Sequence, residues 1–197
     1  MKNKYNKIEL LSYADHVITF NYTNTYEKFY VRNDVVHIHG NVDEQVVLGT
    51  ILDETDENHA ANIMFLDFSK YFQRIEYGTD DNYILWRNKF KNYSYHLFVM
   101  GHSLDGTDKD ILVEMFDNAQ EVTILCHKES MKMLYHKKLL ALFGKEKHQI
   151  LRREKNLQML LVDNELEEIT DKLKIDWIRK EEEKFYSRTM QDRTHVI

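Results

Sequence analysis

The chain of 197 residues contains no proline and only one cysteine, Cys126. The lack of proline removes the commonest rigid linker residue, and no glycine- and serine-rich segment marks a boundary between domains. A single cysteine excludes an internal disulfide and a Cys-x-x-Cys zinc site, which fits a reducing cytosol. Because Cys126 lies in an apolar run, we interpret it as a core thiol rather than as a nucleophile.

Long apolar runs and a strong charge of one sign are also missing. No stretch of about 18 apolar residues is present to span a membrane, and the N-terminus lacks the apolar segment of a signal peptide. The net charge is -6, from 27 basic and 33 acidic residues. These charges are interspersed and leave no basic stripe for nucleic acid. We therefore expect a cytoplasmic protein that binds neither membranes nor nucleic acids.

The composition that remains is that of a globular domain, with 43% hydrophobic and 12% aromatic residues. Apolar runs predict strands at 16–21, 35–39, 46–48, 96–100, 122–126 and 157–162, and continuous runs of this kind indicate a sheet covered on both faces. The segments between them predict helices at 24–30, 60–75, 108–118, 129–143 and 165–184. This alternation predicts an α/β domain over 1–163 and a helical tail over 164–197, with 186–197 mobile.

Asn21 lies at the C-terminal end of the first of these predicted strands, just before a predicted helix. In open α/β folds, ligands bind at the carboxyl ends of the strands, and an amide there is suited to orienting a water or a ribose hydroxyl. Alternatively, Asn21 and Thr23 only cap the turn and the helix, which is the commoner role of a lone asparagine in this position.

His37 and His39 lie two residues apart, so on a strand their rings point to the same face. They are candidates for a metal site, although no further ligands follow at matching spacing. They are also candidates for ordinary core histidines. A third interpretation takes His39 as a general base or ribose-binding group, because Gly40 allows a ligand to approach closely and imidazole titrates near neutral pH.

A polar turn that begins at Gly101 follows the predicted strand at 96–100. Its backbone N–H groups and the next helix N-terminus are suited to holding a phosphate or ribose, and the Ser103 hydroxyl adds one more donor. The turn also approaches the Gly-x-Ser-x-Gly nucleophile elbow, except that Asp105 replaces the second glycine. A serine hydrolase that uses Ser103 with a histidine such as His127 is therefore a weaker alternative.

Several motifs occur in a defined order: Thr19-Phe20-Asn21-Tyr22-Thr23-Asn24-Thr25-Tyr26-Glu27, His37-Ile38-His39-Gly40-Asn41, Val47-Leu48-Gly49, and Gly101-His102-Ser103-Leu104-Asp105 with Asp108. Together they resemble the abortive-infection AbiH family, a branch of the sirtuin-like fold, over positions 16–127. The resemblance implies a three-layer Rossmann-like sheet that binds NAD. It also implies that Asn21 and His39 are catalytic, and that NAD contacts Thr19, Asn21, Gly40, Gly101, His102 and Ser103.

The chain departs at two places from the patterns of sirtuins and of AbiH-like proteins. One cysteine cannot build the four-cysteine zinc module of deacylating sirtuins, so a deacylase is not expected. Nothing before His16 resembles the strand and glycine-rich phosphate loop with which these families begin, so we expect a chain that lacks this segment. Two hypotheses follow: an NAD-hydrolysing phage-defence protein in its complete form, or a non-catalytic module that pairs with a partner chain or a second copy.

Overall fold

The computed structural model describes residues 8–30, 35–49, 63–79, 81–91, 93–162 and 167–193. The chain divides into two compact units, one formed by His16–Leu160 and the other by Met1–Asp15 together with Leu161–Ile197. None of the helices in these described ranges is long and apolar enough to cross a membrane.

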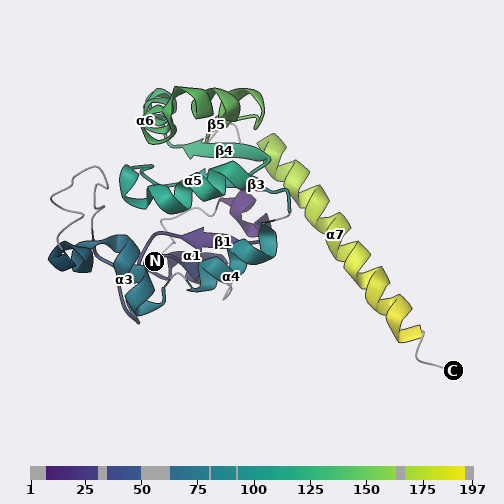
Figure 1. Ribbon diagram of the computed structural model, residues 1–197. Coiled ribbons are helices and arrows are strands. Elements are labelled where there is room, and N and C mark those ends of the chain that lie inside the picture. The colour runs from purple at the N-terminus through teal and green to yellow at the C-terminus, as the bar shows by residue number, and fades with distance from the viewer. Residues whose placement is uncertain are drawn as a thin grey trace, which may run out of the picture. The chain divides into compact units, whose positions relative to one another are not determined.

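The larger unit alternates strands and helices (Figure 1). Its elements are β1 Val17–Thr19, α1 Thr25–Tyr30, β2 Val35–His37, the 3-10 helix η2 Ile63–Phe68, α3 Lys70–Tyr77, α4 Asp81–Phe90, β3 His96–Met100, η3 Gly106–Asp108, α5 Lys109–Asn118, β4 Glu121–Cys126, α6 Glu129–Arg153 and β5 Gln158–Leu161. The strands form two small sheets, in the orders β1-β2 and β3-β4-β5. β1 runs parallel to β2, and β3 runs parallel to β4. The α/β prediction is therefore confirmed.

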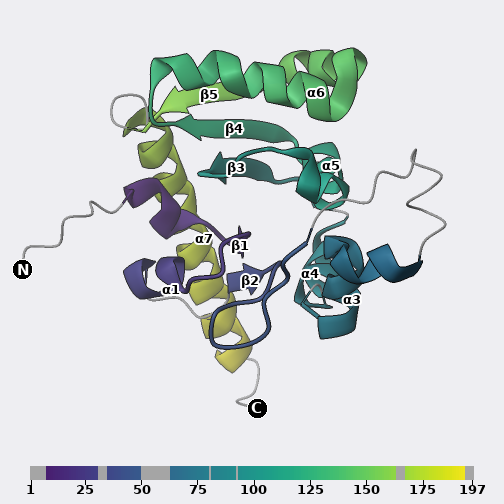
Figure 2. The same cartoon turned by 90° about the vertical axis from the view of Figure 1, so that its left-hand side faces the viewer.

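The core of this unit lies around β4, the central strand of the three-stranded sheet (Figure 2). Every residue of β4 from Val122 to Cys126 is buried, as are Phe116 of α5 and Leu139 of α6. A strand whose successive side chains are all buried must be covered on both faces, because neighbouring side chains point to opposite sides. The continuous apolar run predicted this cover correctly.

Two predicted helices differ from the observed ones at a capping residue. The helix expected over 60–75 divides at Ser69, whose hydroxyl accepts a hydrogen bond from the N–H of Phe72 and so starts α3 after η2; positions 60–62 lie outside the described residues. The helix expected to end before Gly144 instead bends there, at φ 78° and ψ 173°, and continues to Arg153. A glycine allows this left-handed backbone without a steric penalty.

Three further local features differ from what the sequence suggests. Asn24 and Glu27 have the spacing of a capping box but do not form one, because Glu27 contacts His37 while Asn24 donates to Asp43. The segment 46–48 forms only an isolated antiparallel bridge between Val46 and Gly40. Helix α4 was not expected, because its apolar residues are consecutive, from Tyr83 to Trp86, and show no helical period.

The smaller unit contains the 3-10 helix η1 Glu9–Tyr13 and the long helix α7 Glu167–Arg193. Ion pairs join α7 to η1 and to the residues just after it, with Lys174 Nζ 3.7 Å from Glu9 Oε1 and Lys180 Nζ 2.8 Å from Asp15 Oδ2. The predicted C-terminal helical extension is present. It continues to Arg193, so the expectation that the chain leaves the helix near 186 was wrong.

Candidate functional site

A cavity of about 100 Å³ lies at the ends of β1 and β3. It is lined by Ile18, Thr19, Phe20, Asn21, Leu97, Phe98, Val99, Met100, Gly101, His102, Leu112, Met115 and Phe116. Four of the residues singled out in the sequence, Thr19, Asn21, Gly101 and His102, therefore line the same cavity although about 80 positions separate the two segments. Small-molecule sites usually enclose roughly 300–1,000 Å³, so this cavity has room for a ribose or a nicotinamide ring rather than for a whole dinucleotide.

Asn21 is held by its backbone, and its side chain stays available. Its N–H donates to Thr19 Oγ1 at 3.1 Å, and its carbonyl oxygen lies 3.2 Å from His37 Nδ1. The exposed side-chain amide makes no hydrogen bond to any residue within the described ranges. Helix α1 begins four positions later, at Thr25. Asn21 thus does not act as a helix cap, and its amide can serve a ligand.

His37 supports the turn after β1 instead of facing the cavity. Its Nδ1 faces the Asn21 carbonyl, which only accepts, and its Nε2 lies 2.5 Å from Glu27 Oε1. Both ring nitrogens therefore face acceptor oxygens. The contact with Glu27 ties α1 to β2.

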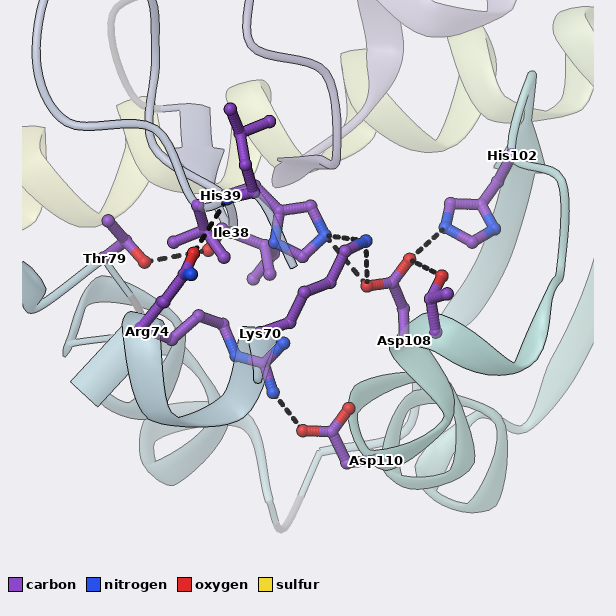
Figure 3. A network of polar contacts seen from close by, with 12 residues as sticks. Ile38, His39, Lys70, Arg74, Thr79, His102, Asp108 and Asp110 are labelled. Carbon is purple, nitrogen blue, oxygen red and sulfur yellow. Dashed lines mark hydrogen bonds and ion pairs between the residues drawn. The ribbon is translucent and has the colours of Figure 1, made fainter. Parts of the chain in front are cut away.

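His39 is the centre of a buried charged network (Figure 3). It is 2% exposed, and its Nε2 lies 2.9 Å from Oδ1 of Asp108 and 3.4 Å from Nζ of Lys70. Lys70 Nζ also donates to Asp108 Oδ1, at 3.1 Å. His39 Nδ1 is buried and has no hydrogen-bond partner. Lys70, the first residue of α3, and Asp108, the residue before α5, thus meet at the His39 ring.

His102 approaches the other oxygen of the same carboxylate, with its Nε2 3.6 Å from Asp108 Oδ2. Its Nδ1 accepts a hydrogen bond from the N–H of Leu104 at 2.9 Å. A nitrogen that accepts carries no proton, so this contact assigns the ring proton of His102 to Nε2, the atom facing Asp108. The Phe20 ring contacts both His102 and His39, at centroid distances of 4.4 and 5.5 Å. His102 therefore connects the cavity to the His39 network.

Asp108 stays ionised at the centre of this network. Burial alone would raise its pKa, but hydrogen bonds from His102 and His39 and the positive charge of Lys70 together hold the pKa well below its usual range. The sequence pattern identified neither Asp108 as the shared partner nor Lys70 at all. Asp108 was visible only as part of the family resemblance and as the first residue of a predicted helix, and Lys70 has no motif around it.

Gly40 is required by close packing of the backbone rather than by an observed ligand. Its φ is 71°, and a Cβ there would lie 1.7 Å from the carbonyl oxygen of Gln45. The turn that it allows brings Val47 back to His39, where the Val47 N–H donates to the His39 carbonyl at 2.9 Å. Tyr22 braces the same turn by donating to the Val47 carbonyl at 3.0 Å.

The turn after β3 contains two residues with left-handed backbone, Gly101 at φ 66° and Leu104 at φ 53°. Leu104 is 2% exposed, so its buried side chain compensates a conformation that costs about 1 kcal/mol or more outside glycine. Ser103 is exposed and does not line the cavity, and its carbonyl accepts a hydrogen bond from Lys138 at 2.7 Å. Of the motif that begins at Gly101, Gly101 and His102 thus line the cavity, whereas Ser103 lies at the surface.

A second ion pair lies beside the network. Arg74 of α3 is 2% exposed and pairs with Asp110 of α5, while its Nε and Nη1 are buried and have no partner. Within the part of the chain that the structure describes, no three His, Cys, Asp or Glu side chains gather in a way that could hold a metal ion.

Comparison with protein families gives one match. The model of the family described as bacteriophage abortive infection AbiH matches residues 1–128, which include β1, β2, β3, β4 and the whole of the network above. No curated protein and no solved structure matches the chain.

Proposed function

The chain belongs to the bacteriophage abortive infection AbiH family, and from this premise we propose that it acts in phage defence by binding NAD and hydrolysing its N-glycosidic bond. One observation carries the proposal: Thr19, Asn21, Gly101 and His102 line a single cavity at the ends of β1 and β3, next to the buried Asp108 carboxylate. The carboxyl ends of strands are where open α/β folds take their ligands.

Each lining residue has a distinct part in this proposal. The free Asn21 amide orients the attacking water, and the Thr19 hydroxyl, which already accepts from the Asn21 N–H, donates its proton to the ribose. The space beside the Gly101 backbone is open, since a Cβ built there would meet no atom within 4 Å. A ligand can therefore approach the backbone at Gly101. His102 and Ser103 bind the parts of the nucleotide that extend from the cavity to the surface.

The reaction breaks the bond between the ribose C1′ and the nicotinamide nitrogen. The electron pair of that bond leaves with nicotinamide, which departs neutral, and a water oxygen bonds to C1′ and releases one proton. Positive charge develops on the ribose before the water arrives, and an ionised carboxylate nearby lowers the energy of that state. Asp108 supplies this charge, and His39, whose Nε2 lies against Asp108 and whose Nδ1 has no partner, takes up the released proton at Nδ1.

The test is release of nicotinamide from NAD in ¹⁸O-labelled water. We expect one labelled oxygen in the ADP-ribose product, and a loss of at least roughly 100-fold in rate for both Asn21→Ala and His39→Gln. Asn118→Ala is the matched control, since Asn118 is an exposed asparagine at the end of α5. Thermal unfolding of each variant checks that the fold is kept. An unlabelled product, or equal rates in all variants, would overturn the proposed hydrolysis.

A second candidate function, a non-catalytic module that pairs with another chain, is favoured by the two sheet edges. β1 and β3 are both edge strands, and both line the cavity. The Thr19 carbonyl accepts a hydrogen bond from the N–H of Ile38, the residue after β2, and so faces β2. Successive residues of a strand point their N–H and C=O groups to opposite sides, so the N–H and C=O groups of Ile18 face away from β2. Such an edge can accept an additional strand.

Hydrogen exchange distinguishes the two functions. If a second copy of the chain adds a strand at β1, the amide of Ile18 should exchange more slowly as the protein concentration rises, in step with dimer formation measured by sedimentation. NAD or ADP-ribose would not reproduce this concentration dependence. Exchange that is independent of concentration, together with a monomer at all concentrations, would exclude the pairing of two copies.

A further inference from the structure

Helix α6 brings together two histidines, His136 and His148, that take no part in the Asp108 network. In a straight helix, residues 136 and 148 would lie about 18 Å apart along the axis. Because the helix bends at Gly144, His136 Nδ1 instead lies 3.2 Å from His148 Nε2. The two rings are nearly perpendicular, at 80°, and their centroids are 5.3 Å apart. Both side chains are half-buried, so solvent still reaches the pair.

We propose that His136 and His148 form a two-histidine binding site for a divalent transition-metal ion of the zinc type. Two imidazole nitrogens bound to one tetrahedral zinc at 2.0–2.1 Å must lie about 3.3 Å apart. The observed separation of 3.2 Å between the facing nitrogens already has this value. Each ring must turn so that its lone pair points to a common metal position instead of at the other ring, and water completes the coordination.

The protonation state of the pair suits a metal. Burial and the charge of Arg152 lower the pKa of both rings, and the pKa of His136 is lowered further by His148. Neutral imidazole is the form that binds metals. Without a metal, one ring donates its N–H to the other; with a metal, the donor ring moves that proton to its other nitrogen. No proton therefore has to leave the neutral pair when the metal binds.

Arg152 opposes the bound cation and thereby offers a specific test. Its guanidinium is close enough to lower the pKa of both histidines. The same positive charge must weaken the binding of a divalent cation at this site. A simple hydrogen-bonded pair with no metal affinity would have no such dependence, so removal of Arg152 separates the two interpretations.

The experiment is a calorimetric titration of the full chain with Zn²⁺ at pH 8, repeated with variants. We expect one site in the wild type, at least tenfold weaker binding in His136→Ala and in His148→Ala, and tighter binding in Arg152→Gln. His127→Ala is the matched control, because His127 is exposed and lies just before α6. Its affinity should equal that of the wild type.

A spectroscopic readout keeps the test valid if a variant unfolds. Cu²⁺ bound to the wild type should give an electron paramagnetic resonance signal split by two nitrogens, and the Arg152→Gln variant should give the same signal. A signal with one nitrogen, or an affinity that survives both histidine substitutions in folded protein, would overturn the site. An unchanged affinity in Arg152→Gln would also count against it.

Discussion

Two pairs of histidines in this protein are built around opposite charges. His39 and His102 approach the two oxygens of the buried Asp108 carboxylate, at 2.9 and 3.6 Å. His136 and His148 face each other, and the nearby charge is the guanidinium of Arg152. The first pair therefore surrounds a fixed anion that can receive developing positive charge, whereas the second is held neutral. The difference teaches that the residue type alone does not fix the role of a histidine; the neighbouring charge does.

The largest predicted effect comes from removing the anion of the first pair. Asp108→Ala should lower the free energy of unfolding by about 3–5 kcal/mol, because it leaves the Lys70 charge buried without its partner. Urea unfolding monitored by circular dichroism measures the change. Asp108→Asn should cost less, because an amide oxygen still accepts from Lys70.

A matched control for this substitution is Asp117→Ala. Asp117 also pairs with a lysine, Lys147, at 2.6 Å, but its side chain is 51% exposed. An exposed pair contributes about 0–1 kcal/mol. If Asp108→Ala proved as mild as Asp117→Ala, the ion pair of Asp108 with Lys70 would not contribute as a buried pair.

The sequence predicted the members of the cavity better than it predicted the members of the network. Thr19, Asn21, Gly101 and His102 lie at the end of an apolar run or directly after one, where open α/β folds place their ligand contacts, so local patterns were enough. Lys70 and Asp108 meet only because α3 packs against the start of α5, a long-range contact with no local signal. The His136–His148 pair was likewise hidden, because Gly144 was expected to end a helix rather than to bend one.

The two pairs should respond to acid in different pH ranges. The pKa of His136 and of His148 is lowered in the folded state, so the unfolded chain binds more protons there. Their stabilising contribution is complete above about pH 6.5, the unfolded pKa, and falls as the pH drops below it. The lowered pKa of Asp108 instead gives stability that is present above about pH 3.9 and is lost below it.

Thermal unfolding from pH 8 to pH 3 measures both responses. The double substitution of His136 and His148 by glutamine should flatten the decline between about pH 7 and pH 5, where imidazole titrates. Asp108→Asn should leave that decline unchanged and reduce the further loss below about pH 4. The reverse assignment of the two ranges would show that the charges facing the two pairs do not control their titration.

The hydrogen bond within the second pair should have a smaller effect than the Asp108 charge. His136→Ala should lower the free energy of unfolding by about 1 kcal/mol, the usual net value for one partly exposed hydrogen bond. In a double-mutant cycle with His148→Ala, the two substitutions should couple by about 0.5–1 kcal/mol. A coupling near zero would mean that the rings are neighbours without a hydrogen bond between them.

The smallest predicted effect concerns the contact between α6, which carries His136 and His148, and the turn after β3, which carries His102. Lys138 of α6 reaches the turn after β3, where its Nζ lies 2.7 Å from Asp105 Oδ1 and from the carbonyl of Ser103. Because Asp105 is 57% exposed, Lys138→Ala should change the free energy of unfolding by no more than about 1 kcal/mol. It should also leave the effects of Asp108→Asn and His136→Ala additive, within about 0.5 kcal/mol. A larger departure from additivity would mean that α6 transmits changes to the Asp108 network through Lys138, and the two histidine pairs would then act as one system rather than as two.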